Sequence, residues 1–268
     1  STFALIGTLQ TIKNRLEKML TSGEYKQIDI NDLIDDDERD LLNEDEDDSF
    51  SVESENGEPI PGQIDRRALL AEIEAIKGFI DIAMRIRYDS KSKALLLALQ
   101  NAFETLPTIG ANQKALIFTE STRTQQYLKE FLEQNGYGEK VITFNGSNTD
   151  KASGAIYDKW CAANAYNGKM SNIKAADRRA AIVDYFRDAA EIMIATEAAA
   201  EGLNLQFCSL VVNYDLPWNP QRIEQRIGRC HRYGQKSDVV VVNFVNQRNY
   251  ADMRVFDLLS EKFHLFSD

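Results

Sequence analysis

Five short apolar runs beyond Gly110 restrict the fold of this chain more than any other feature of its sequence. Longer stretches separate them, and in these stretches apolar residues recur at helical spacing. Such alternation is typical of parallel strands, because each parallel neighbour requires a long crossover that a helix usually supplies. The sequence therefore predicts an α/β fold with an open, mainly parallel sheet and helices on both faces. The predicted strands are residues 115–118, 141–144, 192–195, 210–213 and 239–244.

The helical stretches define the remaining parts of the chain. Crossover helices are predicted at residues 122–134, 176–187 and 220–232, and a helix at 250–263 follows the last strand. Further helices are predicted upstream at residues 3–20, 64–86 and 91–103, with Ser90 capping the third. We expect a helical extension over residues 1–90, with an acidic insertion near 22–63, and a principal domain over residues 91–268. The length of 268 residues, 43% of them apolar, suits one such core.

Charge is distributed unevenly along the chain. Residues 29–58 contain fifteen acids and one base, whereas the rest of the chain contains 27 acids and 30 bases. The net charge of −11 therefore does not argue against a nucleic-acid partner, since the chain outside this segment is mildly basic. A stretch so rich in acids buries little apolar surface, which predicts a flexible insertion. Two roles remain open for it: a solvated linker, or a mimic of nucleic acid that guards a basic face.

The segment QRIGRCHRYGQ at residues 225–235 carries the strongest chemical signal. Arg226, Arg229 and Arg232 recur every three residues, so on one helix their guanidinium groups crowd together. Crowded like charges destabilise a fold unless an anion neutralises them. A triphosphate is such an anion, and an arginine that neutralises a transferred phosphoryl group accelerates the transfer by roughly 10³ to 10⁵. The alternative is a surface cluster that pairs with acids such as Glu224.

Four motifs in order show which family residues 114–244 resemble. KALIFTE at 114–120, TFNGS at 143–147, ATEAAAEGLNLQ at 195–206 and the arginine segment are similar to successive motifs of the C-terminal lobe of superfamily-two helicases. DLPWNP at 215–220 is the usual lead-in to the last motif in the Swi/Snf group and its bacterial RapA-like relatives. The resemblance implies the second RecA-like lobe of an ATP-dependent motor that moves along nucleic acid, with duplex DNA as the expected partner.

The resemblance also implies roles for residues near the nucleotide. Arg229 and Arg232 match the arginine fingers that reach ATP held by the first lobe, and Gln225 matches the residue that supports them. Three further positions near the nucleotide are matched by Gly202, Asn204 and Glu201. Glycine permits close backbone approach, and asparagine both donates and accepts hydrogen bonds, which suits a ribose. A simple turn remains the alternative explanation for the glycine and the asparagine.

Nucleic-acid contacts are implied at the strand ends and on the helix before the third motif. The residues concerned are Thr196, Thr119, Ser121, Asn145, Ser147 and Arg178. In parallel sheets ligands bind beyond the carboxyl ends of the strands, where the first five of these residues are expected. Small polar residues at such places are also ordinary helix caps and turns, and that explanation remains open. Trp218 is expected to hold the DLPWNP loop, and an extra helix within residues 146–178 has an open role in binding or packing.

Several other chemistries are not indicated. The chain has no GxxxxGK[ST] loop and no acidic strand end of the kind that binds ATP with magnesium, so we expect a separate upstream lobe to hold both. This chain alone is then expected to be inactive. Neither the three cysteines nor the two histidines have a spacing that suits a metal site or disulfides. No apolar run is long enough to span a bilayer, and we expect a cytoplasmic protein without a membrane partner.

Two functions from different classes fit these features. The first is the second motor lobe of an ATP-dependent DNA translocase or helicase, which supplies arginine fingers and grips the nucleic-acid backbone. The second is a non-catalytic interaction module, either a degenerate helicase lobe or an acidic scaffold. Intact Gln225, Arg229 and Arg232 favour the first, because a lobe released from catalysis has no reason to keep clustered charges.

Removal of residues 29–58 from the parent protein tests whether the acidic segment mimics nucleic acid. If the segment guards a basic face, its loss should tighten the binding of duplex DNA several-fold at low salt. The gain should shrink above about 0.2 M salt, where such charges are screened. Fluorescence-anisotropy titrations at low and high ionic strength measure the change. An unchanged Kd at low salt would leave the segment as a linker.

Overall fold

The computed structural model describes residues 2–22, 66–85, 90–166, 168–171, 173–197, 202–217, 219–233, 235 and 237–264. Most of the predicted acidic insertion lies outside these residues, as do Glu201 and Trp218. The chain divides into two compact units, Ser1–Asp89 and Ser90–Asp268. Each unit has a hydrophobic core of its own.

The first unit contains two long helices, α1 (Thr2–Ser22) and α3 (Arg66–Met84). Ile73, Ile76 and Ile80 recur at intervals of three and four along α3, which places them on one side of the helix. They form a buried cluster with Leu16 of α1. Both helices predicted from the apolar spacing are therefore present, and their apolar sides pack together.

The second unit is built on five parallel strands in the order β2-β3-β1-β4-β5. The strands are β1 (Ala115–Phe118), β2 (Val141–Phe144), β3 (Ile192–Ala195), β4 (Leu210–Asn213) and β5 (Val240–Asn243). Four of them coincide with the predicted ranges. The register places Phe118 beside both Ala195 and Asn213, so β1 lies at the centre of the sheet. The predicted α/β class with a parallel sheet is confirmed.

Helices connect and cover the strands of this unit. They are α4 (Ser90–Thr105), α5 (Thr122–Leu132), α6 (Lys151–Asn164), α7 (Lys174–Asp188), α9 (Pro220–Cys230) and α10 (Tyr250–His264). Shorter helical turns lie at Leu106–Ile109, Glu133–Tyr137 and Gly138–Lys140. The extra helix predicted within residues 146–178 is α6, and it packs against α7.

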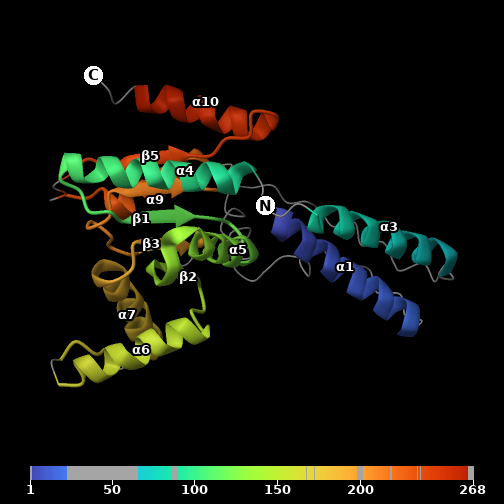
Figure 1. Ribbon diagram of the computed structural model, residues 1–268, viewed down its shortest axis with the longest axis horizontal. Coiled ribbons are helices and arrows are strands. Elements are labelled where there is room, and N and C mark those ends of the chain that lie inside the picture. The colour runs from blue at the N-terminus through green and yellow to red at the C-terminus, as the bar shows by residue number, and fades with distance from the viewer. Residues whose placement is uncertain are drawn as a thin grey trace, which may run out of the picture. The chain divides into compact units, whose positions relative to one another are not determined.

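Alternate residues of each strand point to opposite faces of the sheet, and helices cover both faces. Ala115 and Ile117 of β1 pack in one core with α4 and α5, whereas Leu116 and Phe118 pack in another with α7 and the end of α9 (Figure 1). Every residue of β1, β2, β3 and β4 is buried. Burial on both sides explains why these runs are almost wholly apolar rather than alternating.

The edge strand β5 departs from its prediction. Its run of valines predicted a buried strand over residues 239–244, but the strand is one residue shorter at each end and all four residues are only partly buried. β5 pairs with β4 on one side and stands last in the sheet order. An apolar run does not reveal whether its strand is central or at an edge, and an edge strand has fewer neighbours to cover it.

Helix α9 determines where the arginine segment lies. It begins after Asn219, whose side chain caps it by accepting a backbone amide, and Pro220 occupies its first turn. It ends at Cys230, and His231 follows with extended backbone angles of φ −90° and ψ 100°. The predicted helix at residues 220–232 is therefore two residues too long, and Arg232 lies outside it.

Candidate functional site

Polar side chains gather at the carboxyl edge of the sheet. Because the strands are parallel and in register, the segments that follow β1, β2, β3 and β4 leave the sheet side by side. These segments, with the first turns of α4 and α5, contribute Lys91, Thr119, Glu120, Ser121, Gln125, Asn145, Thr196, Glu197 and Asp215. Arg226 reaches the same place from α9.

Arg226 is the central cation of this edge, and it is only 1% exposed. Its Nε donates to Glu197 Oε2 at 2.6 Å, and its Nη2 forms an ion pair with the same carboxylate. Its Nη1 donates to Asn213 Oδ1 at 3.0 Å and to the backbone oxygen of Asp215 at 2.8 Å. The guanidinium lies 4.9 Å from the centroid of the Phe118 ring. One side chain thus joins α9 to the ends of β1, β3 and β4.

The prediction that three arginines crowd on one helix is therefore wrong. A carboxylate of the same chain neutralises Arg226, as the cost of removing a charge from water requires. Arg232 follows the end of α9, where it is exposed and its Nε lies 3.2 Å from the backbone oxygen of Gly228. Arg229 remains in the last turn of α9, partly buried. Among the described residues, neither Arg229 nor Arg232 has a carboxylate partner.

Three donors fix the carboxylate of Asp215, which follows β4. Lys91 Nζ lies 2.8 Å from its Oδ1, and Thr119 Oγ1 donates to its Oδ2 at 2.6 Å. The backbone amide of Glu120 lies 3.3 Å from the same Oδ2. Burial acts to raise the pKa of Asp215, but the Lys91 ammonium and the hydrogen bonds lower it more, so the pKa lies below its usual range. Asp215 is therefore an ionised anchor for the start of α4 and the end of β1.

Thr119 supports this anchor and is not a surface residue. Its side chain is 0% exposed, and its hydroxyl is used by Asp215. The direct contact with nucleic acid stays a prediction for Thr119, and a phosphate would have to replace Asp215 as the acceptor of this hydroxyl.

Ser121 and Thr196 keep hydroxyl groups that have no hydrogen-bond partner among the described residues. Ser121 is 6% exposed and precedes α5 without capping it through its side chain, and Thr196 is 1% exposed directly after β3. A buried polar group without a partner costs about 1–3 kcal/mol. Two such groups at one edge of the sheet could each donate to an oxygen-rich ligand, and the contacts with nucleic acid stay predictions for both.

Glu120 is an acid whose surroundings favour its neutral form. Burial raises its pKa most, and the carboxylates of Asp215 and Glu197 raise it further, against the opposing influence of Arg226 and Arg222. The resulting pKa is about 7. The charge of this edge therefore changes near neutral pH.

The remaining residues predicted to contact nucleic acid lie in a turn and on a helix. The Oδ1 atom of Asn145 accepts a hydrogen bond from the backbone amide of Asn148 at 2.7 Å. The Oδ1 atom of Asn148 accepts one from the backbone amide of Asn145 at 2.9 Å. Ser147 is exposed between them. Arg178 lies on α7 with its guanidinium 5.5 Å from the Tyr157 ring of α6, and its Nε is buried with no partner among the described residues. The ordinary-turn explanation for Asn145 and Ser147 thus stays open beside the functional one.

The residues predicted to face the nucleotide form a second group. Gly202 has a φ of 72°, in the left-handed region that glycine tolerates. Asn204 is exposed, and its Oδ1 lies 3.4 Å from the Gln206 amide, as in a turn. This turn runs beside the arginine segment, because the Leu205 amide donates to the backbone oxygen of Arg229 at 2.9 Å. The side chain of Gln206 extends the contact past α9, where its Nε2 lies 3.1 Å from the backbone oxygen of Tyr233.

This second group lies away from the carboxyl edge. Cys208, three residues beyond Leu205, contacts the backbone oxygen of Lys114 at the start of β1 through its Sγ, at 3.4 Å. Thr196 and Glu197 thus lie at the carboxyl edge, the Gly202–Gln206 turn lies toward the amino edge, and α9 runs from the first toward the second. Gln225 is exposed on α9, and Glu201 lies outside the described residues.

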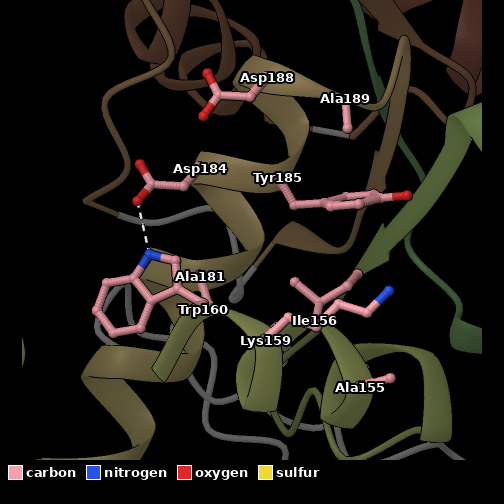
Figure 2. A pocket seen from close by; sticks show the side chains of 9 residues that line it. All are labelled: Ala155, Ile156, Lys159, Trp160, Ala181, Asp184, Tyr185, Asp188 and Ala189. Carbon is pink, nitrogen blue, oxygen red and sulfur yellow. Dashed lines mark hydrogen bonds between the residues drawn. The ribbon is translucent and has the colours of Figure 1, made fainter. Parts of the chain in front are cut away.

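A cavity of about 320 Å³ lies between α6 and α7 (Figure 2). Ile156 and Trp160 of α6 and Tyr185 of α7 supply much of its apolar lining. The indole Nε1 of Trp160 donates to Asp184 Oδ2 at 2.7 Å. The cavity ends at Ala189, near the amino end of β3, so it is distinct from the carboxyl edge.

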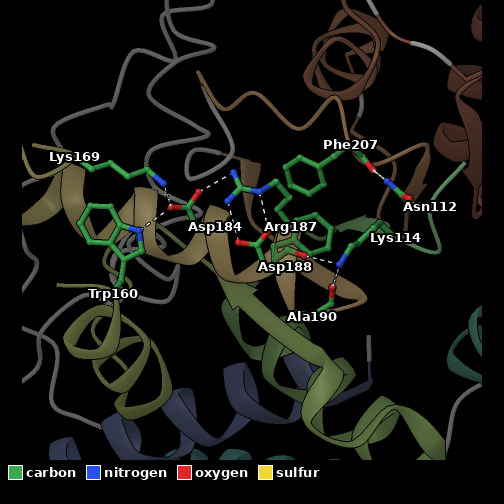
Figure 3. A network of polar contacts seen from close by, with 10 residues as sticks. Asn112, Lys114, Trp160, Lys169, Asp184, Arg187, Asp188, Ala190 and Phe207 are labelled. Carbon is green, nitrogen blue, oxygen red and sulfur yellow. Dashed lines mark hydrogen bonds and ion pairs between the residues drawn. The ribbon is translucent and has the colours of Figure 1, made fainter. Parts of the chain in front are cut away.

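Polar contacts around α7 hold α6 and β1 in place (Figure 3). Asp184 accepts Lys169 Nζ at 2.6 Å and pairs with Arg187 at 2.9 Å. Lys114, the first residue of the KALIFTE motif, donates to the backbone oxygens of Phe186 and Ala190 at 2.9 and 2.5 Å. These carbonyls lie at the end of α7, where a cation is favourable. Lys114 is thus a helix-capping residue.

Other kinds of site are not seen in the described part of the chain. It contains no group of three His, Cys, Asp or Glu side chains placed to bind a metal, and none of its helices is long and apolar enough to cross a membrane. All three cysteines are free thiols. Cys208 and Cys230 are buried, and Cys161 is partly exposed.

A family model described as the helicase conserved C-terminal domain matches residues 96–234, more than half of the chain. The matched range contains every residue of the two groups except Lys91, and the whole of α9. The chain belongs to this helicase family. The predicted C-terminal lobe of a superfamily-two helicase is therefore confirmed.

Relatives of this helicase domain are much longer than the chain itself. It is 34% identical over 204 residues to an uncharacterized ATP-dependent helicase, YqhH, of Bacillus subtilis, a match that covers 76% of this chain and 30% of the relative. It is 45% identical over 65 residues to the RNA polymerase-associated protein RapA of Sodalis glossinidius, which covers 24% of this chain and 7% of the relative. The chain thus matches less than a third of either relative.

Two solved structures are also similar to the helicase domain. The C-terminal part of the Fun30 ATPase domain has 18% identity and a TM-score of 0.44, with 76% of this chain and 59% of that one covered. The C-terminal domain of the DEAD-box protein Dbp5 has 22% identity and a TM-score of 0.39, with 62% and 77% covered.

Sequence reasoning missed five residues of the carboxyl edge: Lys91, Glu120, Gln125, Glu197 and Asp215. Each acts through partners distant in sequence, as Lys91 does with Asp215, 124 positions away. The sequence offered one signal for such residues: a polar residue directly before or after a predicted strand, or in the first turn of a predicted helix. Glu197, next to the predicted Thr196, fits that signal.

Substitution of Arg226 tests the buried ion pair. Arg226→Met keeps the apolar stem but leaves Glu197 buried without its cation, so the free energy of unfolding should fall by about 3–5 kcal/mol. Urea unfolding followed by circular dichroism measures the loss. Arg254→Met, on the exposed side of α10, is the matched control and should change stability by less than about 0.5 kcal/mol. A loss for Arg226→Met no larger than that of the control would contradict a structural role.

Substitution of Glu120 tests the raised pKa. The folded protein binds the Glu120 proton more tightly than the unfolded chain, so wild-type stability falls as pH rises from 4.5 to about 7. Glu120→Gln removes this loss, and the variant should be more stable than wild type at about pH 8 by about 1–3 kcal/mol. Near pH 4.5 the two proteins should differ little. Urea unfolding at both pH values gives the comparison, and a difference that does not depend on pH would contradict the raised pKa.

Proposed function

We propose that this chain is the second motor lobe of an ATP-dependent DNA translocase or helicase. In this role it supplies Arg229 and Arg232 to ATP held by another lobe of the parent protein. The carboxyl edge of its sheet grips the nucleic-acid backbone. The names of the relatives support ATP-dependent helicase activity in the parent protein, and the division of labour among the arginines supports the role of this lobe.

One observation carries the proposal: Arg226 is neutralised within the chain, whereas its two neighbours in the motif are not. Arg229 and Arg232 have no carboxylate partner in the described residues, and Arg232 is exposed. The end of α9 that carries them lies beside the Gly202–Gln206 turn, because the backbone amide of Leu205 donates a hydrogen bond to the backbone oxygen of Arg229. Two cations left free next to a turn with an exposed asparagine suit an anionic ligand that also carries hydroxyl groups.

The nucleotide fits this second group of residues. Bound ATP would supply the phosphoryl group whose transfer to water drives the motor. Arg229 and Arg232 would hold its phosphate oxygens, and guanidinium groups suit phosphate because they offer several donors in one plane. Asn204 would bond a ribose hydroxyl, and Gln225 would support the arginines. Magnesium would be held by the other lobe, since the described residues contain no cluster of ligands for it.

The nucleic acid is assigned to the carboxyl edge. Ser121 and Thr196 have buried hydroxyls that no described residue bonds, and Asn145, Ser147 and Arg178 lie on neighbouring segments. Hydroxyl, amide and guanidinium donors bind phosphate oxygens without reading sequence, which suits a motor that must move along any sequence. Thr119 acts in this proposal as a support for Asp215. Duplex DNA is proposed as the substrate because DLPWNP at 215–220 resembles the Swi/Snf group.

The alternative of a non-catalytic module is less well supported. A lobe that no longer meets a nucleotide gains nothing from Arg229, a partly buried guanidinium that lacks a counter-charge in the described residues. The buried pair of Arg226 shows that this chain does neutralise an arginine when it is only structural.

The arginine fingers are tested in the parent protein. Arg229→Ala and Arg232→Ala should each lower the DNA-stimulated ATPase kcat at least about a hundredfold, which is about 2.7 kcal/mol of transition-state stabilisation. The melting temperature should stay close to that of wild type. Arg254→Ala on α10 is the matched control and should leave kcat unchanged. Wild-type turnover in both finger variants would reject the assignment.

The same assay identifies the nucleic acid. Duplex DNA, single-stranded DNA and RNA are compared at equal nucleotide concentration, and duplex DNA is expected to stimulate turnover most. Stronger stimulation by RNA would favour the activity named for another relative, the ATP-dependent RNA helicase eIF4A of Scheffersomyces stipitis, which is 38% identical over 84 residues.

A further inference from the structure

Gln125, near the start of α5, bridges the carboxyl ends of two strands. The side chain is 2% exposed. Its Nε2 donates to the backbone oxygen of Phe144 at 3.0 Å and to that of Ile194 at 2.8 Å. These carbonyls belong to the ends of β2 and β3, so one amide group holds the two strands at the edge where they release their loops.

The other end of the same amide reaches the loop after β2. Gln125 Oε1 accepts Asn145 Nδ2 at 3.3 Å. The orientation of the amide is determined by its surroundings, because the opposite assignment would set its oxygen against two carbonyl oxygens. The side-chain amide of Gln125 is therefore bonded to two backbone oxygens and to Asn145, a residue predicted to contact nucleic acid.

The bonds of Gln125 continue to each of the loops assigned to nucleic acid. The carbonyl of Phe144 also accepts the backbone amide of Thr196 at 3.1 Å, and the backbone amide of Gln125 donates to the backbone oxygen of Ser121 at 2.9 Å. Asn145 Oδ1 in turn lies 3.3 Å from Ser147 Oγ. The side chain of Gln125 thus reaches Asn145 directly and Thr196 through the Phe144 carbonyl, and its backbone reaches Ser121.

A buried amide needs a reason beyond packing. A leucine or methionine would fill a similar volume at this position without having to leave water as a polar group. Phosphates along a nucleic-acid strand stand at fixed intervals, so donors from three separate loops bind them well only if their spacing is fixed beforehand. Gln125 meets that need, because its three partners set the positions of the loops relative to one another.

We propose that Gln125 is a positioning residue that fixes the spacing of the nucleic-acid contacts of this lobe. The proposal rests on the function proposed above. Gln125 itself touches neither ligand. Its effect passes through Asn145 and through the ends of β2 and β3.

The experiment compares Gln125→Met with Gln126→Met in the parent protein. Gln126 is exposed on the same helix and its side chain bonds Glu130, so the control makes the same change away from the edge. Gln125→Met should raise the concentration of duplex DNA required for half-maximal ATPase stimulation about tenfold. The KM for ATP and the kcat at saturating DNA should stay within about twofold of wild type. Gln126→Met should match wild type in all three quantities.

These readouts separate positioning from stability. A purely structural role would lower the melting temperature of Gln125→Met and leave the half-saturating DNA concentration unchanged, and that result would overturn the proposal. Asn145→Ala, alone and combined with Gln125→Met, tests the route. If Gln125 acts through Asn145, the combined effect is smaller than the product of the single effects, whereas fully multiplicative effects would overturn the link.

Two further outcomes are distinguishable. If Gln125→Met does not fold, Gln125→Asn replaces it, because this variant keeps a buried amide one methylene too short to reach both carbonyls. A half-saturating DNA concentration about threefold above wild type is then expected, and an unchanged value would overturn the proposal. If wild-type parent protein shows no stimulation by any nucleic acid, the proposed function fails and this inference fails with it.

Discussion

The buried ion pair between Arg226 and Glu197 is the interaction on which the rest of this lobe depends. Removing either charge from water costs several kcal/mol, and further hydrogen bonds from the guanidinium to Asn213 and to the backbone of Asp215 offset part of that cost. The pair joins α9 to the end of β3 and so determines where α9 lies on the sheet. The position of α9 then determines the position of Arg229.

Two surfaces with different ligands are assigned to this single small sheet. The carboxyl edge carries the hydroxyl and amide groups proposed to hold nucleic acid, and the Gly202–Gln206 turn with the end of α9 carries the groups proposed to hold the nucleotide. Helix α9 carries Arg226 at the first surface and Arg229 at the second. A motor requires such a connection, because hydrolysis at one surface must alter the grip at the other, and continuous backbone is a direct physical link.

Local patterns predicted the strands and helices well, and long-range contacts explain what they missed. The strands β1 to β4 were predictable because each is a short apolar run between polar residues. The burial of Arg226 was not, since its partners lie 29 and 13 positions away and nothing in the spacing of the motif distinguishes it from Arg229. The end of α9 at Cys230 could not be predicted either, because neither glycine nor proline follows that residue directly. The bridging role of Gln125 depends on carbonyls 19 and 69 positions distant.

The unequal burial of the three thiols has a practical consequence. Cys208 and Cys230 are sealed in the core between the sheet and its helices, whereas Cys161 on α6 is reached by solvent. A maleimide fluorophore added to the native lobe would therefore attach at Cys161, a single defined point on α6. Rotation of this lobe during a catalytic cycle could then be followed by energy transfer to a second dye without first removing native cysteines from it.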